Sequence, residues 1–217
     1  MSGFDAGSPE RFMLIQGTPG RPSHWTHMPI YRAVPIRNFV NNRRIVRHPG
    51  KRLPGNIPYL VDNLWEFARP EAMPSRRHAV YASPTAELAL ENALVPNTSA
   101  ADYVVCEVAF ERPAPMIQLS VKDARWHPDV GTLQRAVNAM IEPWVDIALS
   151  KRLPLAPLFM PGATKVDLTE AMEGSPELLY ILMQVSKLVT LWDDAAAPSG
   201  ELFFELTEDN AYRLTHI

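Results

Sequence analysis

The sequence has little cysteine and no long apolar run. Cys106 is the one cysteine among 217 residues, so no disulfide can form within the chain. No stretch reaches the roughly 18 consecutive apolar residues of a membrane-spanning helix. The first residues also do not combine a basic segment with an apolar one, as a secretory signal does. We therefore expect a soluble protein of the cytoplasm with no membrane span.

The motifs of several well-known catalytic sites are also missing. The sequence has no phosphate-binding loop of the GxxxxGK[ST] type, no GxGxxG, no GxSxG, no HExxH and no CxxC. Kinases, common hydrolases and zinc proteases are therefore disfavoured. His24 and His27 are close in sequence, but no carboxylate or cysteine lies beside them at the usual metal-ligand spacing, so we expect no metal site.

Composition points to one domain with long connections. The chain is 47% hydrophobic, which is enough to fill one substantial core. Its 21 prolines are about twice the usual share and concentrate between the apolar segments. We expect a partly ordered tail over residues 1–27 and a single catalytic domain over 28–217.

Basic residues are concentrated in the first part of the chain. Residues 1–80 contain 12 Lys and Arg against 5 Asp and Glu, whereas the remainder contains 9 against 19. One short window holds Arg32, Arg37, Arg43, Arg44, Arg47, His48, Lys51 and Arg52. Such a segment is typical of a phosphate or nucleic-acid binder, and equally of a solvated loop. Phe39 is its only aromatic residue for base stacking.

The first half of the chain contains one clear strand-to-helix signal. Apolar residues alternate with others over residues 28–36, which prolines bound, and this predicts a short strand at an edge or at the start of a sheet, with Arg32 at its centre. Residues 37–76 predict a long ordered loop, in which only PYLVDNLWEF has an apolar pattern that can pack. The segment HAVYASPTAELALENAL then predicts a strand and a helix, with Ser83 as N-cap and Pro84 at the first helical position.

The second half mixes strands and helices without regular alternation. Residues 103–121 predict two strands, and 131–150 predict a helix that Pro143 kinks or ends. A helix capped by Ser175 follows, apolar nearly all round and therefore expected to be buried. Strands are expected near 200–206 and 211–216. This order favours an α+β fold with a mixed or antiparallel sheet and flanking helices.

The candidate site residues come from these elements. A charged Arg32 inside a short apolar strand must either reach solvent at an edge or meet an anion. Tyr81 and Ser83 lie at a strand-to-helix junction, where side chains and free N–H groups face a cleft, although they equally fit a core residue and a cap. Two acidic pairs follow, Glu87 with Glu91 on the helix and Glu201 with Glu205 on the late strand.

This order of an early Arg, a Tyr-x-Ser junction and a Glu resembles the ADP-ribosyltransferase superfamily. The matching segments are PIYRAVP (29–35) and AVYASPTAELALE (79–91), which look like the opening strand and the Glu-bearing helix of the RES-domain toxins. The resemblance implies a split mixed or antiparallel sheet with NAD bound in its cleft as a substrate. The sequence has no clear counterpart to the Gly-Gly-Arg-Trp motif of RES domains and no serine that matches their late serine, so bacterial effector ADP-ribosyltransferases fit at least as well.

The resemblance also implies roles for individual residues. Arg32 would bind the phosphates or a ribose of NAD, with Tyr31 beside it, and Tyr81 with Ser83 would line the nicotinamide end. Glu91 would stabilise the cationic sugar, and Glu205 or Glu201 is the alternative catalytic acid on the late strand.

Several functions remain open on this basis. The resemblance implies a toxin or effector that transfers ADP-ribose to a macromolecule, a protein rather than a nucleic acid, without a metal. It also implies an antitoxin or immunity protein as a partner and, for a delivered effector, the cytoplasm of a target cell. The alternatives are an NAD-degrading glycohydrolase or phosphorylase, a non-catalytic phosphate- or nucleic-acid-binding module, and an assembly protein of a phage or secretion system.

Overall fold

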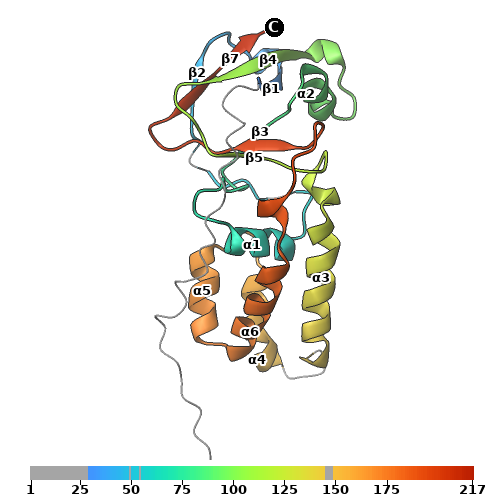
Figure 1. Ribbon diagram of the computed structural model, residues 1–217, viewed down its shortest axis with the longest axis vertical. Helices are drawn as coiled ribbons and strands as arrows, with labels where there is room; N and C mark the ends of the chain where they lie inside the picture. Colours follow the sequence, from blue (N-terminus) through green and yellow to red (C-terminus); the bar gives the residue numbers. More distant parts are fainter. Residues whose placement is uncertain (1–28, 49, 54, 145–148) are drawn as a thin grey trace, which may run out of the picture.

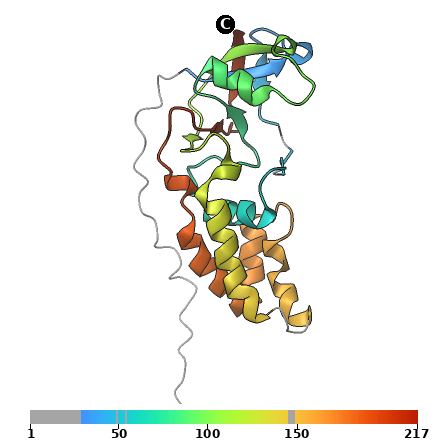
Figure 2. The same cartoon turned by 90° about the vertical axis from the view of Figure 1, so that its right-hand side faces the viewer.

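The computed structural model describes residues 29–48, 50–53, 55–144 and 149–217, so the expected tail over 1–27 lies outside the described residues. All the strands lie at one end of the molecule with helix α2 (Ala86–Ala93), and the other helices form the opposite end (Figure 1). The perpendicular view shows the same division (Figure 2). The α+β class predicted from the sequence is confirmed, with two antiparallel sheets and flanking helices.

The larger sheet has four strands in the order β1-β4-β7-β2, and every pair in it is antiparallel. Its strands are β1 (Tyr31–Pro35), β4 (Tyr103–Phe110), β7 (Ala211–His216) and β2 (Arg44–Val46). The proline-bounded segment forms β1 at the edge of this sheet, as predicted, because an edge strand tolerates the missing N–H of proline.

The smaller sheet has three antiparallel strands in the order β3-β6-β5. They are β3 (Val80–Ala82), β6 (Leu202–Phe204) and β5 (Met116–Gln118). One antiparallel bridge joins the two sheets: Tyr31 and Ser83 exchange two main-chain hydrogen bonds of 2.8 Å each. The bridge brings the start of β1 beside the end of β3.

A hydrophobic core fills the space between the sheets. Leu202 and Phe204 of β6 belong to this core, and the ring of Phe204 meets Phe110 and Tyr212 edge-on. Because successive strand side chains point to opposite faces, Phe203 packs on the other side, in a second core among the helices. The three β6 residues therefore contribute to both cores.

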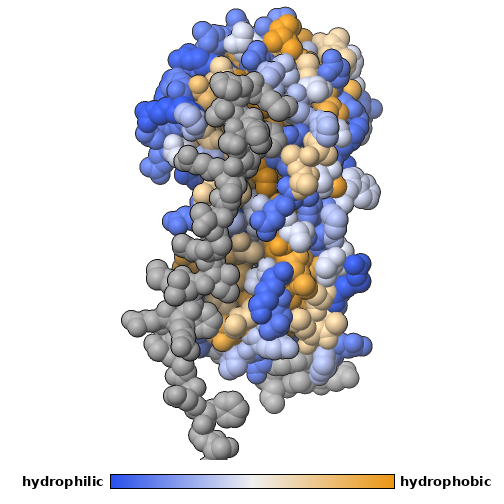
Figure 3. Space-filling model, viewed as in Figure 1, coloured by the Kyte–Doolittle hydropathy of each residue, from blue (hydrophilic) through white to orange (hydrophobic). Residues whose placement is uncertain are grey.

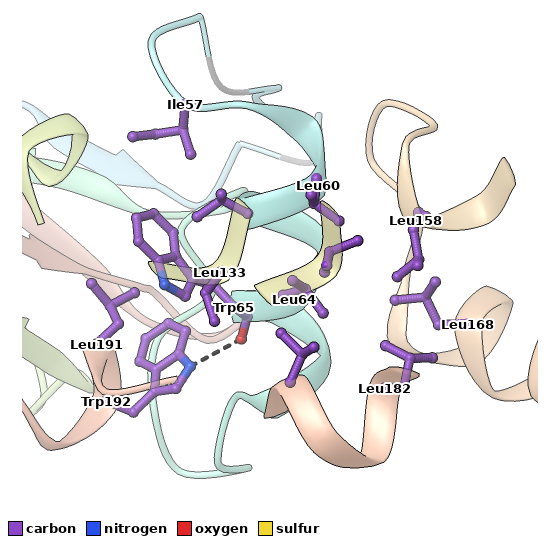
Figure 4. Close-up of a cluster of buried hydrophobic side chains, with 14 of the residues drawn as sticks. Ile57, Leu60, Leu64, Trp65, Leu133, Leu158, Leu168, Leu182, Leu191 and Trp192 are labelled. Atoms are coloured by element: carbon purple, nitrogen blue, oxygen red, sulfur yellow. Dashed lines mark hydrogen bonds between the residues drawn. The ribbon is translucent and has the colours of Figure 1, made fainter. Parts of the chain in front are cut away.

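The second core occupies the helical end of the molecule (Figure 4). The helices of this end are α1 (Tyr59–Ala68), α3 (Pro128–Ile141), α4 (Leu149–Arg152), α5 (Lys165–Glu173) and α6 (Pro176–Val185). Buried residues of α1, α3, α5 and α6 belong to the core. Leu60, Leu64 and Trp65 of α1 recur at helical spacing and are all buried. The indole N–H of Trp192 donates to the carbonyl oxygen of Trp65 at 2.9 Å. No helix in the described ranges is long and apolar enough to cross a membrane.

The N-terminus of α3 is held to α1 by one buried carboxylate. Asp129 accepts hydrogen bonds from the indole Nε1 of Trp65 at 2.8 Å and from the hydroxyl of Thr190 at 2.6 Å. It also accepts from the main-chain N–H groups of Thr190 and Leu191, at 3.0 and 3.1 Å. Three segments distant in sequence therefore meet at this carboxylate.

Three sequence predictions need correction. Residues 37–76 are not one long loop, because they contain β2 and α1; only the packing of PYLVDNLWEF was anticipated. Helix α2 is capped by Thr85, whose hydroxyl accepts from Leu88 N, so Ser83 is not the cap. Helix α6 does begin after Ser175, but its Tyr180 is 59% exposed, so the helix is not buried all round. Apolar surface is visible on this helical half of the molecule (Figure 3).

Replacing Gly200 by Ala is expected to lower the free energy of unfolding by about 1–3 kcal/mol. A Cβ at this position would lie 1.7 Å from the carbonyl oxygen of Leu119, so the loop before β6 would have to move away from the end of β5. Urea denaturation of the variant measures the loss. Gly174→Ala is the control, because its Cβ would have its nearest neighbour at 3.9 Å. Equal stabilities of the two variants would contradict the expectation.

Candidate active site

A cavity of about 630 Å³ lies where the two sheets meet. Residues of β1, β3 and α2 line it, together with residues 52–53 and 55–56 and residues near 122–125 and 201. Of the seven residues to which the resemblance assigns roles, six are among its lining: Tyr31, Arg32, Tyr81, Ser83, Glu91 and Glu201. The volume falls within the roughly 300–1,000 Å³ of pockets that hold a drug-sized ligand.

The bridge between the sheets explains why distant residues meet here. Pairing of Tyr31 with Ser83 places β1 beside the residues that follow β3. The Ser83 hydroxyl is buried and accepts a hydrogen bond from Asn92 Nδ2 at 3.1 Å. Ser83 therefore ties α2 to the strand junction, a different role from the helix cap predicted for it.

Arg32 lines the cavity and is anchored from its own sheet. Its Nη1 donates to the hydroxyl of Tyr212, and its guanidinium lies 5.8 Å from the centre of the Tyr212 ring. It forms no ion pair with any residue of the described ranges. Its charge is therefore available to an anionic ligand while one edge of the group is held by Tyr212.

Tyr81 presents an aromatic ring to the cavity. The guanidinium groups of Arg52 and Arg76 lie 5.1 and 5.9 Å from its ring centre, and Phe203 packs against it at 5.8 Å. Burial raises the pKa of Tyr81, so its phenol stays protonated at neutral pH. A ring fixed in this way can stack on a flat heterocycle.

Arg76 also lines the cavity, although it was not predicted from the sequence. Only 6% of this residue is exposed, and its Nε and Nη1 have no hydrogen-bond partner in the described part of the chain. The available signal was a pair of adjacent arginines shortly before strand β3. Sequence alone does not distinguish which of the two is paired inside the protein.

Glu201 is a partly buried carboxylate of the cavity and forms no ion pair among the described residues. One of its oxygens accepts a hydrogen bond from the N–H of Ala124 at 2.8 Å. Burial raises the pKa of Glu201, and the positive charge of Arg76 acts in the opposite direction. A desolvated carboxylate of this kind is well suited to stabilise a nearby cation, because little water competes for it.

The other two candidate acids have different surroundings. Glu91 lines the cavity, but its side chain is 63% exposed and lies 3.6 Å from the ammonium of Lys122. Glu205 is not among the lining residues: it forms an ion pair with Arg47 at 3.0 Å and accepts from the N–H of Ser75 at 2.7 Å. Of the two acids that line the cavity, Glu201 is therefore the less exposed.

The cavity has an excess of positive charge. Three of its acids are already paired, Asp62 with Arg77, Glu91 with Lys122 and Asp123 with Arg125. The lining cations Arg32, Arg52 and Arg76 have no such ion pair within the described ranges and face one further carboxylate, Glu201. Such a cavity attracts an anionic ligand.

The basic window of the sequence is dispersed in the structure. Arg52 lines the cavity, whereas Arg44 pairs with Glu111 and Arg47 pairs with Glu205. Among the described residues, no group of three or more His, Cys, Asp or Glu side chains is arranged to hold a metal ion. Comparison of the chain with protein-family models, curated proteins and solved structures gives no match.

Proposed function

We propose that this protein is an NAD-dependent ADP-ribosyltransferase of toxin or effector type, with an ADP-ribosyltransferase-like arrangement of its two sheets. It cleaves the bond between nicotinamide and ribose and transfers ADP-ribose to a macromolecule, a protein rather than a nucleic acid. The observation that carries the proposal is one cationic cavity containing Arg32, Tyr81 and Glu201, which lie far apart in sequence.

The chemistry of the lining fits this reaction. The carbon–nitrogen bond of the glycoside breaks, its electron pair leaves with nicotinamide, and the ribose becomes a cationic sugar. Glu201 supplies the negative charge that stabilises this sugar, and Arg32 holds the adjacent ribose or phosphate so that the reactive carbon stays in place. The nucleophile then bonds to the sugar carbon and loses its proton to a carboxylate or to water.

Glu91 fits a second task at the mouth of the cavity. Its exposed side chain lies on α2, where an acceptor from solution can reach it. A carboxylate in this position can orient the incoming nucleophile or take its proton. We therefore assign charge stabilisation to Glu201 and acceptor activation to Glu91.

The first experiment uses NAD labelled on its adenylate side, with and without a cell lysate. Nicotinamide release with label transferred to protein supports the transferase. Release without transfer indicates an NAD-degrading glycohydrolase or, in phosphate buffer with formation of a sugar phosphate, a phosphorylase. No release, together with no binding of NAD in a titration, would overturn the proposal and favour the binding or assembly alternatives.

Replacing Arg32 by Ala is expected to raise the Kd for NAD about tenfold, because a charge-assisted hydrogen bond is lost. Isothermal titration calorimetry measures the change. Arg44→Ala is the matched control, since Arg44 pairs with Glu111 and does not line the cavity. An unchanged Kd in the Arg32 variant would remove this residue from the ligand site.

A further inference from the structure

Arg76 and its neighbour Arg77 are both buried, but they differ in their hydrogen-bond partners. Arg77 is 3% exposed and fully engaged: it donates to Asp62 at 2.9 Å, to Asn63 at 2.7 Å and to the carbonyl oxygen of Ala163 at 2.7 Å. Arg76 is 6% exposed, yet its Nε and Nη1 have no partner in the described ranges. Removing a charge from water without a counter-ion costs several kcal/mol, so Arg76 needs an explanation that Arg77 does not.

Aromatic rings hold the Arg76 guanidinium in place without neutralising it. Its central carbon lies 5.0 Å from the ring centre of Trp65, 5.8 Å from that of Phe203 and 5.9 Å from that of Tyr81. Cation–π contacts of this kind fix the position of a guanidinium and leave its positive charge in the cavity. Glu201 is close enough to be influenced by this charge but forms no ion pair with it.

The guanidinium of Arg52 also lies beside the Tyr81 ring. The central carbon of Arg52 lies 5.1 Å from the ring centre of Tyr81. The main-chain N–H of Arg52 donates to the carbonyl oxygen of Arg77 at 2.7 Å, which ties its segment to the residue that follows Arg76. The two cations therefore face one part of the cavity.

We propose that Arg52 and Arg76 form an anion-binding subsite beside Tyr81 that takes the diphosphate of a nucleotide ligand. Two cations without ion-pair partners match two adjacent phosphate groups, and guanidinium groups bind phosphate oxygens through paired N–H donors. The nucleotide part of this inference rests on the proposed function; the anion-binding part does not. With the diphosphate here, Arg32 is left to contact a ribose.

The test compares ligands that differ in their phosphates. ADP-ribose, ADP, adenosine and inorganic pyrophosphate are titrated into the full chain and into its Arg76→Gln variant. We expect the variant to bind ADP-ribose, ADP and pyrophosphate about 10–100-fold more weakly and adenosine as tightly as the unchanged protein does. Equal affinity of the two proteins for ADP and pyrophosphate would overturn the subsite.

Stability separates a ligand-binding role from a structural one. Because Arg76→Gln removes a buried charge that has no counter-ion, its Tm is expected to equal or exceed that of the unchanged protein. Arg77→Gln is the opposite case and is expected to lower the Tm, since it breaks three buried contacts. A Tm of Arg76→Gln lowered as far as that of Arg77→Gln would make Arg76 structural and overturn the proposal.

Further variants distinguish failure of the subsite from failure of the proposed function. Arg52 is exposed, so Arg52→Gln should fold normally and still weaken the binding of ADP and pyrophosphate. Arg44→Gln removes an equal charge outside the cavity and should leave the binding of both ligands unchanged. Binding of pyrophosphate and ADP without any turnover of NAD would keep the subsite and reject the transferase. Absence of binding to all the phosphate ligands would reject the subsite.

Discussion

Glu201→Gln is expected to lower the kcat for nicotinamide release from NAD by about 10²–10³-fold, the usual cost of losing one electrostatic contact to a transition state. The amide keeps the size of the side chain, and the carbonyl oxygen can still accept from Ala124 N. Only the negative charge beside the cationic sugar disappears. The Kd for NAD should therefore change little, which a titration alongside the kinetics would verify.

Two other variants make this prediction specific. Glu205→Gln should retain kcat, because Glu205 does not line the cavity and its carboxylate serves Arg47 and Ser75. Glu91→Gln should lose transfer to the acceptor more than nicotinamide release, in keeping with its exposed position. Full activity of the Glu201 variant with loss in the Glu205 variant would reverse the assignment.

The pH profile provides a further readout of Glu201. Burial raises its pKa, so its ionised form is lost at a higher pH than for an ordinary glutamate. Because the proposed role requires the ionised form, activity should fall as the pH is lowered through this raised pKa. Arg76 counteracts the rise, so the acidic limb of the profile should move to still higher pH in Arg76→Gln. An acidic limb at the ordinary value in both proteins would exclude Glu201 as the titrating group.

Asp129→Ala is expected to lower the free energy of unfolding by about 3–5 kcal/mol, as removal of a buried charged partner generally does. The substitution removes four hydrogen bonds and leaves the Trp65 indole N–H and the Leu191 N–H without an acceptor inside the protein. It also removes a negative charge from the first turn of α3, where the helix dipole favours one. Urea denaturation gives the size of the loss.

An exposed aspartate serves as the control for this experiment. Asp167 belongs to the capping box of α5 with Thr164, at the surface of the protein. Asp167→Ala should cost about 1 kcal/mol, the typical value for a helix cap. If Asp129→Ala cost no more than Asp167→Ala, the buried carboxylate would not hold α1 and α3 together as described.

Much of the fold was predictable because its signals are local. Prolines placed β1 at a sheet edge, and the Pro113 and Pro115 pair separated β4 from β5. Strand β2 was missed because only Ile45 of its three residues is partly buried, so its pairing with β7 leaves no apolar alternation. Helix α1 was missed because its buried Asp62 and Asn63 look like loop residues until Arg77 is seen to bind them.

The site was predictable for a different reason, and only in part. Arg32, Tyr81 and Glu201 were identified from their places on strands and junctions, and the cavity contains all three. The sequence could not show which of Glu201 and Glu205 faces the cavity, because two residues four apart on a strand point to the same side of it. Only the tertiary contacts of Arg47 and Ser75 show that Glu205 is engaged elsewhere. Arg76 was missed because an unpaired buried charge can be recognised only when every neighbour is known.

Strand β6 has a consequence for how the molecule unfolds. Its residues Leu202 and Phe204 complete the core between the sheets, while Phe203 completes the core among the helices. Neither half can lose its packing without exposing one side of the same three-residue strand. The sheets and the helices should therefore melt in a single cooperative transition, and neither half should fold when expressed without the other.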